Sequence, residues 1–361
     1  MENTYCVIMA GGIGSRFWPM SRTVHPKQFL DILGTGRTLL QQTYDRFLNL
    51  CPKENIYVVT NDDYTDLVKQ QLPDLNDDQI LSEPARKNTA PCAAYASYKI
   101  GSINPNASII IAPSDHLITK EDTFVKAIKS CVIKTREEDC LVTLGIKPTR
   151  PDTGYGYIQF HELEWKYDER LKKVKTFTEK PNLEMAKFFI ESGDFLWNSG
   201  IFIWNFKSFE NALEKHLPET ALIFKDGMDK YNTPAEKAFI EQAYGQCPSI
   251  SIDYAIMEKA DNVYVRASAI GWSDLGTWGS LYANTKKDKN RNAVVGKNVM
   301  LYDTSHCIVN VPKDKLVVIQ GLENYIVVES DNILLICKKD DEQQIKTFVN
   351  EIKIKKGDLF V

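Results

Sequence analysis

An alternation of short apolar runs with helix-type segments over the first 150 residues constrains the fold more than any other feature. Apolar runs typical of strands are Tyr5–Met9, Ile56–Thr60, Ser108–Pro113 and Leu141–Ile146, and the segments between them that predict helices are Thr38–Leu50, Pro91–Ile100 and Phe124–Arg136. Ser108–Pro113 is apolar throughout, as expected of a strand whose two faces are both covered. This rhythm predicts a mostly parallel sheet between layers of helices, the α/β class.

The second half of the chain predicts a change of architecture. Further strands are expected at Tyr157–Phe160, Val174–Glu179 and Ile201–Asn205, with a helix at Leu183–Glu191. The polar segment NTKKDKNRN (284–292) has no apolar anchor, so we expect a linker or an exposed loop there. Five short β runs follow between 299 and 337, and a last amphipathic helix is expected within Asp340–Lys353. We therefore predict a large α/β domain over 1–285. A small β-rich domain, resembling a few coils of a β-helix, is expected over 286–361.

Composition excludes several classes of protein. A length of 361 residues suggests about two domains, and 44 Lys+Arg against 48 Asp+Glu argues against a nucleic-acid binder. No apolar run approaches the ~20 residues of a membrane span, and the first residues do not resemble a secretion signal. The eight cysteines form no CxxC pair, so we expect free thiols, no structural zinc and a cytoplasmic location.

The segment AGGIGSRFWPMSRTVHPKQFL (10–30) follows directly on the first predicted strand. Gly11, Gly12 and Gly14 let the backbone turn and come close to a ligand, and successive N–H groups in such a loop suit phosphate. Arg16 and Lys27 add two cations, whereas a purely structural interpretation would make them exposed charges on a tight turn. The segment has neither the GK[ST] of a Walker loop nor the GxGxxG spacing, so we predict a different kind of phosphate-binding loop.

Two further motifs follow predicted strands. In EPARKNTAPC (83–92), Asn88 or Thr89 could cap the alanine-rich helix that follows. In IIIAPSDHLI (109–118), Asp115 comes at the carboxyl end of a buried strand, where α/β sheets bind ligands. A carboxylate there suits Mg²⁺ beside a phosphorylated ligand, and the alternative is a cap on the next helix.

The remaining motifs are TGYGYIQF (153–160), FTEKP (177–181), LWNSGIF (196–202), SIDYAIMEK (251–259) and GWSDLGTW (271–278). Each of the first three, taken alone, could be only a turn, with Glu179–Lys180 ending one strand and Asn198 beginning another. Trp197 and Tyr157 could equally be core aromatics. Asp253 and Glu258 are expected to be partly structural.

The segment RFWPMSRTVHPKQFL and the motifs after it resemble, in order, those of the sugar-1-phosphate nucleotidylyltransferases, most closely the GTP-dependent mannose-1-phosphate guanylyltransferases. The resemblance covers residues 1 to about 285 densely and the β-rich tail more weakly. It implies a Rossmann-like, GT-A-like nucleotidyltransferase fold with a mixed sheet flanked by helices, followed by a β-helical unit. It also implies that the chain transfers GMP from GTP to mannose 1-phosphate with Mg²⁺ or another divalent cation.

The resemblance assigns roles to individual residues. Those implied to be catalytic are Arg16, Lys27, Asp115, Lys180 and Asp274, with Asp115 and Asp274 as the metal carboxylates. Those implied to bind the nucleotide are Ala10, Gly11, Gly12, Gly14, Ser15, Arg16, Lys27, Glu83, Asn88, Thr89 and Ser114, with the guanine edge at Glu83 and Asn88. Those implied to bind the sugar phosphate are Gly154, Tyr155, Gly156, Glu179, Lys180, Asn198 and Gly200.

A sugar phosphate is mostly a dianion at pH 7, so it needs no general base to attack the α-phosphorus of GTP. We therefore expect in-line displacement of pyrophosphate without a covalent enzyme intermediate. Alternatives are a nucleotidylyltransferase for another sugar or base, a non-catalytic regulatory subunit that binds a nucleotide sugar, and an NAD(P) enzyme with Asp62 on the ribose. The retained cations and carboxylates argue against the second, and the loop spacing against the third. We expect a monofunctional enzyme without an isomerase domain, acting as a homodimer and binding neither nucleic acid nor membranes.

Overall fold

The computed structural model describes residues 3–165 and 168–361 and divides the chain into two compact units. The first unit holds the chain up to Gly11 together with Thr43–Ser114 and Ile118–Trp272; the second holds Gly12–Gln42, Asp115–Leu117 and Ser273–Val361. The second unit thus takes in residues 12–42 and 273–285 as well as the tail. The sequence boundary at 285/286 remains a prediction.

The first unit is built on one mixed sheet of nine strands in the order β3-β2-β1-β4-β9-β6-β10-β8-β7. Its strands are β1 (Thr4–Met9), β2 (Ile56–Asn61), β3 (Ile80–Glu83), β4 (Ser108–Pro113), β6 (Leu141–Ile146), β7 (Gly156–Trp165), β8 (Asp168–Glu179), β9 (Phe195–Asn205) and β10 (Val263–Ala267). β1 pairs in parallel with β2 and β4, whereas β9 runs antiparallel to β4 and β6. This arrangement confirms the predicted α/β class with a mixed sheet.

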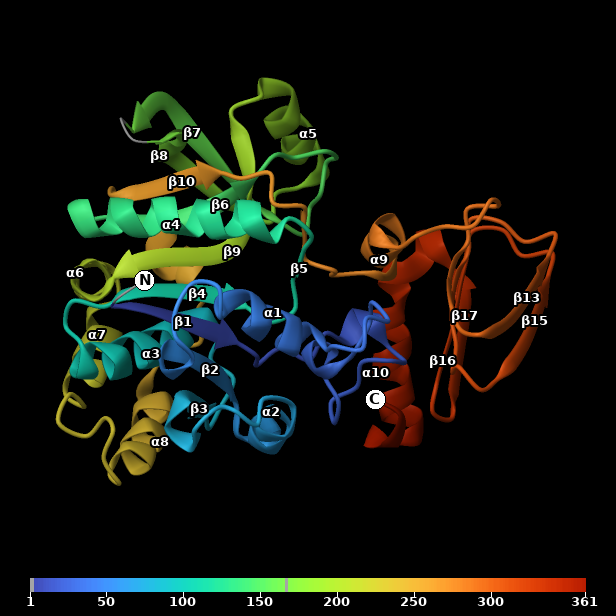
Figure 1. Ribbon diagram of the computed structural model, residues 1–361, viewed down its shortest axis with the longest axis horizontal. Helices are drawn as coiled ribbons and strands as arrows, with labels where there is room; N and C mark the ends of the chain where they lie inside the picture. Colours follow the sequence, from blue (N-terminus) through green and yellow to red (C-terminus); the bar gives the residue numbers. More distant parts are fainter. Residues whose placement is uncertain (1–2, 166–167) are drawn as a thin grey trace. The chain divides into compact units, whose positions relative to one another are not determined.

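Helices cover both faces of this sheet (Figure 1). The helices of the unit are α1 (Leu39–Phe47, which begins in the second unit), α2 (Thr65–Gln71), α3 (Thr89–Ile103), α4 (Glu121–Glu137), α5 (Leu183–Ser192), α6 (Phe206–His216), α7 (Pro218–Lys225) and α8 (Glu236–Gln246). Alternate residues of β1 point to opposite faces, so Tyr5 and Val7 join the core cluster with α3, while α4 packs against β4, β6 and β9. The core therefore consists of two layers on either side of one sheet.

Several element boundaries differ from the sequence prediction. β9 begins at Phe195, so Asn198 lies inside a strand and does not begin one. The reason is that β7 pairs with the first part of β9, which gives Phe195–Trp197 strand partners that no local pattern indicates. β8 ends at Glu179, as predicted. The helices α6 to α8 occupy a stretch for which we predict no elements.

The second unit contains a small β-helix and two helices (Figure 1). Its strands form two sheets: β12 (Ala293–Val295), β14 (Ile308–Asn310), β16 (Tyr325–Ser330) and β17 (Ile333–Lys338) in one, and β13 (Asn298–Tyr302) and β15 (Leu316–Gln320) in the other. Parallel partners are 18 residues apart where Asn298 pairs with Leu316 and Ile308 with Ile326, and 15 residues apart where Ala293 pairs with Ile308. One coil therefore takes 15 to 18 residues, and the predicted β-helix-like unit is confirmed.

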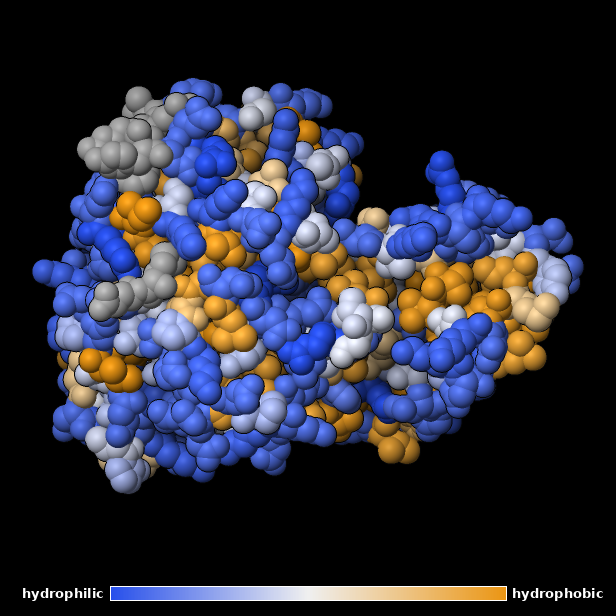
Figure 2. Space-filling model, viewed as in Figure 1, coloured by the Kyte–Doolittle hydropathy of each residue, from blue (hydrophilic) through white to orange (hydrophobic). Residues whose placement is uncertain are grey.

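The β-helix has an apolar interior and a partly apolar exterior. Alternate residues of β13 and β15, such as Val299 and Ile319, face a core cluster with Val309 and Val327. The intervening side chains Met300, Tyr302, Leu316 and Val318 are exposed, and Figure 2 shows apolar residues gathered over these C-terminal strands. The opposite face of the four-stranded sheet packs with α9 (Trp278–Asn284) and α10 (Ile345–Lys356).

The polar segment 284–292 is largely an exposed loop, as expected, and it is anchored at its last residue. Asn292 is fully buried; its Oδ1 accepts from the Cys307 N–H (3.0 Å) and its Nδ2 donates to the Thr304 carbonyl (2.9 Å). A polar side chain thus does the anchoring, which a search for apolar residues misses. All eight cysteines are free thiols. Among the described residues, no helix is both long and apolar enough to span a bilayer.

Candidate active site

The glycine-rich loop leaves β1 and turns at Gly14, whose φ of 68° is in the left-handed region. A Cβ on Gly14 would lie 2.5 Å from the Cβ of Lys27, so glycine is needed for both conformation and space. Gly12 is exposed, Ser15 and Arg16 are partly exposed, and Ser15–Phe17 form a short 3-10 helix (η1). Ala10 is buried, and its N–H already donates to the Val59 carbonyl (2.7 Å). The N–H of Ala10 is therefore not free for phosphate.

Lys27 is the centre of the polar contacts in the second unit. Its ammonium lies 2.8 Å from Oδ2 of Asp115 and donates to the carbonyls of Asp274 (2.9 Å) and Leu275 (3.0 Å). It also lies 5.5 Å from the centre of the Phe17 ring. The Lys27 side chain is only 4% exposed and its three donors are engaged, so it is not the exposed charge that a purely structural interpretation of the motif would make it.

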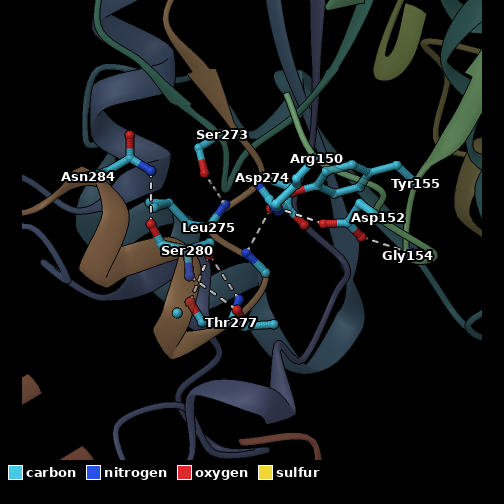
Figure 3. Close-up of polar contacts among 12 residues, drawn as sticks. Arg150, Asp152, Gly154, Tyr155, Ser273, Asp274, Leu275, Thr277, Ser280 and Asn284 are labelled. Atoms are coloured by element: carbon cyan, nitrogen blue, oxygen red, sulfur yellow. Dashed lines mark hydrogen bonds and ion pairs between the residues drawn. The ribbon is translucent and has the colours of Figure 1, made fainter. Parts of the chain in front are cut away.

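The two predicted metal acids meet this lysine through different groups, Asp115 through its carboxylate and Asp274 through its backbone carbonyl. Burial opposes ionisation of Asp115, but the Lys27 ammonium outweighs it and, with His116, holds the pKa of Asp115 below its ordinary value. Asp274 is folded into its own turn, where Oδ1 accepts from the Gly276 N–H at 3.0 Å (Figure 3). A Cβ on Gly276 would overlap the Asp274 carboxylate, which explains the glycine of the GWSDLGTW motif.

In the first unit, Glu83 ends β3 as a nearly buried acid, 7% exposed. Its Oε1 accepts from the Tyr244 hydroxyl (2.8 Å), and a Cβ on Gly11 would be 3.4 Å from its Oε2. Burial raises the pKa of Glu83 to about 7 against the lowering effect of the Tyr244 hydrogen bond. The structure thus brings the first glycine of the loop next to the predicted base-recognition acid.

Asn88 and Thr89 do not cap α3 with their side chains. Asn88 has a positive φ of 63° and donates from Nδ2 to the Ser249 hydroxyl (2.9 Å). The Thr89 hydroxyl accepts from the Ile252 N–H (2.8 Å). The alternative in which Asn88 or Thr89 caps the helix through its side chain is therefore excluded, because tertiary partners take these groups. Ser114, another predicted nucleotide-binding residue, is buried, and its carbonyl accepts from the Thr43 hydroxyl (3.1 Å).

The predicted sugar motifs converge within the first unit. A Cβ on Gly156 would overlap Oε2 of Glu179 and lie 3.3 Å from the Cβ of Asn198. Lys180, 61% exposed, lies 3.1 Å from Oε1 of Glu179, and its own N–H donates to the Tyr155 carbonyl (3.2 Å). Gly200 has a φ of 69° and donates its N–H to Oδ1 of Asn198 (3.1 Å). Three motifs that are distant in sequence thus surround one carboxylate.

Sequence reasoning missed the role of Arg150 beside these motifs. Arg150 donates to Asp152 (2.7 Å) and lies over the rings of Tyr155 (5.8 Å) and Trp197 (5.3 Å). Asp152 in turn accepts from the Gly154 N–H (2.9 Å), as Figure 3 shows. Trp197 is buried with no hydrogen-bond partner for Nε1 among the described residues. The sequence signal that could have identified Arg150 was its position two residues before Asp152 in a loop rich in Pro and Gly.

The second missed residue is Asp253, whose Oδ1 accepts from Nδ2 of Asn198 (2.8 Å). Burial and the Glu179 carboxylate raise the pKa of Asp253 to about 7, and burial raises that of Glu258 as well. The SIDYAIMEK motif therefore supplies an acid to the same cluster, which the expectation of a partly structural role did not include.

Two family models match the chain: the nucleotidyl transferase model over residues 5–291 and the mannose-phosphate isomerase/GMP-like β-helix domain over 296–352. A mannose-1-phosphate guanylyltransferase of Escherichia coli is 34% identical over 356 residues, covering 96% of this chain and 75% of the relative. The one of Salmonella montevideo is 36% identical over 354 residues, with 96% and 74% covered. A crystal structure from Thermus thermophilus, described as a mannose-1-phosphate geranyltransferase, is similar with a TM-score of 0.87 at 28% identity, covering 97% of this chain and 99% of that one.

The fold, the motifs and these similarities define the class, and the chain belongs to the nucleotidyl transferase family, in its mannose-1-phosphate guanylyltransferase branch.

Proposed function

We propose that this chain transfers GMP from GTP to α-D-mannose 1-phosphate and releases pyrophosphate, forming GDP-mannose. The observation that carries the proposal is the set of contacts of Lys27, because it gathers groups from three separate family motifs around one ammonium. Relatives with 34% and 36% identity along 96% of the chain, which bear the name of this activity, support it.

Glu83 is suited to reading guanine. The guanine edge presents two adjacent donors, N1–H and N2–H, and a carboxylate can accept from both. Gly11 has no side chain beside Oε2 of Glu83, so a base can approach the carboxylate from that side. Uracil and adenine do not present this pair of donors, so Glu83 favours GTP.

Asp115 and Asp274 fit a divalent cation. Mg²⁺ takes one or two carboxylates together with phosphate oxygens, and Asp115 already balances the positive charge of Lys27. The described residues hold no cluster of three His, Cys, Asp or Glu side chains, so phosphate oxygens would complete the coordination. When bound, the cation neutralises charge on phosphates that would otherwise repel each other.

The remaining residues bind and orient the two anionic substrates. Arg16, which has no ion-pair partner in the described part of the chain, and Lys27, after exchanging one of its partners, would bind the triphosphate. Lys180, exposed and close to Glu179, would bind the phosphate of the sugar. The sugar phosphate is mostly dianionic at pH 7, so it attacks the α-phosphorus in line without a general base and without an enzyme-bound intermediate.

The decisive assay is pyrophosphate release with GTP and mannose 1-phosphate together, compared with GTP alone. We expect release only with both substrates, and a lower kcat/KM with UTP, ATP or glucose 1-phosphate. Equal release without the sugar phosphate, or trapping of a nucleotidylated side chain, would refute the proposal.

A variant pair tests the metal carboxylate. We expect Asp115→Asn to lower kcat by about 100-fold or more while the protein stays folded, because one positioned charge contributes about that much. The control is Asp314→Asn, which changes an exposed aspartate of the same unit and should keep full activity. A near-normal rate for the Asp115 variant would exclude its role.

Two expectations about the state of the protein belong to this proposal. The first is a homodimer, which light scattering on the purified chain would test. The second is a cytoplasmic location, which cell fractionation would test.

A further inference from the structure

Asp253 is an acid that the proposed reaction does not use, although it contacts a residue of the sugar-binding motifs. It is the first residue of a π-helix, η6 (Asp253–Met257), and its carboxylate accepts from Nδ2 of Asn198 at 2.8 Å. π-Helical turns are rare and occur frequently at functional sites. Asp253 is only partly exposed, which limits the contact of its carboxylate with water.

Asn198 is held in one orientation by its contacts. The Gly200 N–H donates to Oδ1 (3.1 Å), which determines which end of the amide is the oxygen, and the Thr143 hydroxyl lies 3.2 Å from the same atom. Nδ2 donates one hydrogen to Asp253. Among the described residues, the second hydrogen of Nδ2 has no acceptor, so Asn198 can donate this hydrogen to a ligand.

The Glu179 carboxylate, a hydrogen-bond acceptor, is a neighbour of the Asn198 side chain. Gly156 has no side chain, and the position that its Cβ would take is next to both Glu179 and Asn198. One amide donor and one carboxylate acceptor at the same place match a sugar hydroxyl, which accepts one hydrogen bond and donates another.

We propose that Asp253 is a positioning residue that holds the Asn198 amide in the orientation that reads a hexose hydroxyl, and so sets the preference among hexose 1-phosphates. The identity of the hexose as mannose rests on the proposed function. Epimeric hexoses differ in the direction of one hydroxyl, so a donor that is held in one direction discriminates between them and a donor free to rotate does not.

The charged groups around Asp253 distinguish a positioning role from a purely structural role. The side chains that act on Asp253 are those of Glu179, Lys180 and Asn198, of which one is an acid, and burial together with the Glu179 carboxylate raises the pKa of Asp253 to about 7. Removing Asp253 therefore relieves repulsion between acids. A structural acid would cost stability when removed, whereas this one should cost little.

The experiment compares Asp253→Ala and Asp253→Asn with the wild type, using mannose 1-phosphate, glucose 1-phosphate and GTP as varied substrates. For Asp253→Ala we expect the KM for mannose 1-phosphate to rise about tenfold and the mannose-to-glucose ratio of kcat/KM to fall by a similar factor, since a hydrogen bond to a charged group contributes about that much. The KM for GTP and the Tm should stay unchanged. Asp253→Asn should restore the KM and the mannose-to-glucose ratio most of the way to the wild-type values, because its amide oxygen still accepts from Nδ2 of Asn198.

The control is Asp261→Asn, an exposed acid close in sequence that pairs only with Lys215 in the described structure (3.2 Å). A double-mutant cycle adds the decisive comparison: in an Asn198→Ala background, Asp253→Ala should change the KM less than twofold. A full effect in that background, no rescue by Asp253→Asn, or an equal rise in the KM for GTP would overturn the inference. If the wild type prefers another sugar phosphate, the proposed function fails, and the same cycle run with that sugar still tests Asp253.

Discussion

Glu83 makes the stability of this protein depend on pH in a way that can be calculated. The carboxylate is 7% exposed and its pKa is raised to about 7, compared with an ordinary value of 4.5. The folded state therefore holds the proton more tightly than the unfolded state does. The stabilisation is fully present below pH 4.5 and is lost as the pH rises through 7.

The difference between a pKa of 4.5 and one of about 7 corresponds to about 3 kcal/mol, so ionised Glu83 should cost the folded protein about 3 kcal/mol at pH 8 relative to pH 4. In Glu83→Gln this cost is absent, although the amide can still accept from Tyr244. We expect the difference in unfolding free energy between Glu83→Gln and the wild type to move by about 3 kcal/mol in favour of the variant between pH 4.5 and 8. Urea unfolding at several pH values measures it, and the comparison cancels other titrating groups such as Asp253.

The same substitution should impair base recognition. In the proposed function, ionised Glu83 would accept from N1–H and N2–H of guanine, so we expect Glu83→Gln to reduce the preference for GTP over ITP, which lacks the N2 amino group. Wild-type affinity for GTP should rise with pH through 7 as Glu83 ionises. A stability difference that stays flat from pH 4.5 to 8 would refute the electrostatic reasoning, and an unchanged GTP-to-ITP ratio would refute the assignment to guanine.

Two substitutions test the packing that supports the site. Gly14→Ala should destabilise the protein by more than the ~1–2 kcal/mol of a left-handed alanine and lower activity, because its Cβ would meet Lys27 at 2.5 Å. Gly34→Ala, with a φ of 70° and no atom within 4 Å of its Cβ, is the matched control and should keep activity; equal melting temperatures for the two variants would contradict the steric argument. Asp168→Ala should cost about 3–5 kcal/mol in urea unfolding, because it leaves the buried guanidinium of Arg266 without its 2.8 Å partner, and a cost below 1 kcal/mol would show that water or another group replaces it.

Local patterns predicted the elements that carry a strong signal in their own residues. The capping box of α1 is present, with Thr38 N–H donating to Oε1 of Gln41 (3.1 Å) and the Gln41 N–H donating to the Thr38 hydroxyl (3.3 Å). The strand at Ser108–Pro113 has its predicted bounds, because an apolar run buried on both faces is a strong signal. The start of β9 was not predictable in the same way, since its first residues are a strand only by virtue of β7.

In the candidate site, too, local patterns predicted some features and contacts between distant segments decided the others. The motifs predict which residues carry the chemistry, and the structure places Gly156, Glu179 and Asn198 close together. Their partners are set elsewhere: Thr89 is bound by residue 252, and Asn198 by Asp253, 55 positions along the chain. No local pattern encodes such a contact, because burial and chain packing decide which polar groups are left to pair.

The sequence by itself determined the class of this protein, since the order of its motifs resembles that of the nucleotidyl transferase family, to which the chain belongs. Only the tertiary structure decided how the charged side chains of the candidate site are used. It buries Lys27 against Asp115 and two carbonyls, buries Glu83 until its pKa is about 7, and brings Asp253 to Asn198. The physical reason is that ionisation and hydrogen bonding depend on distances of about 3 Å and on burial, both of which arise from packing between segments far apart in the chain.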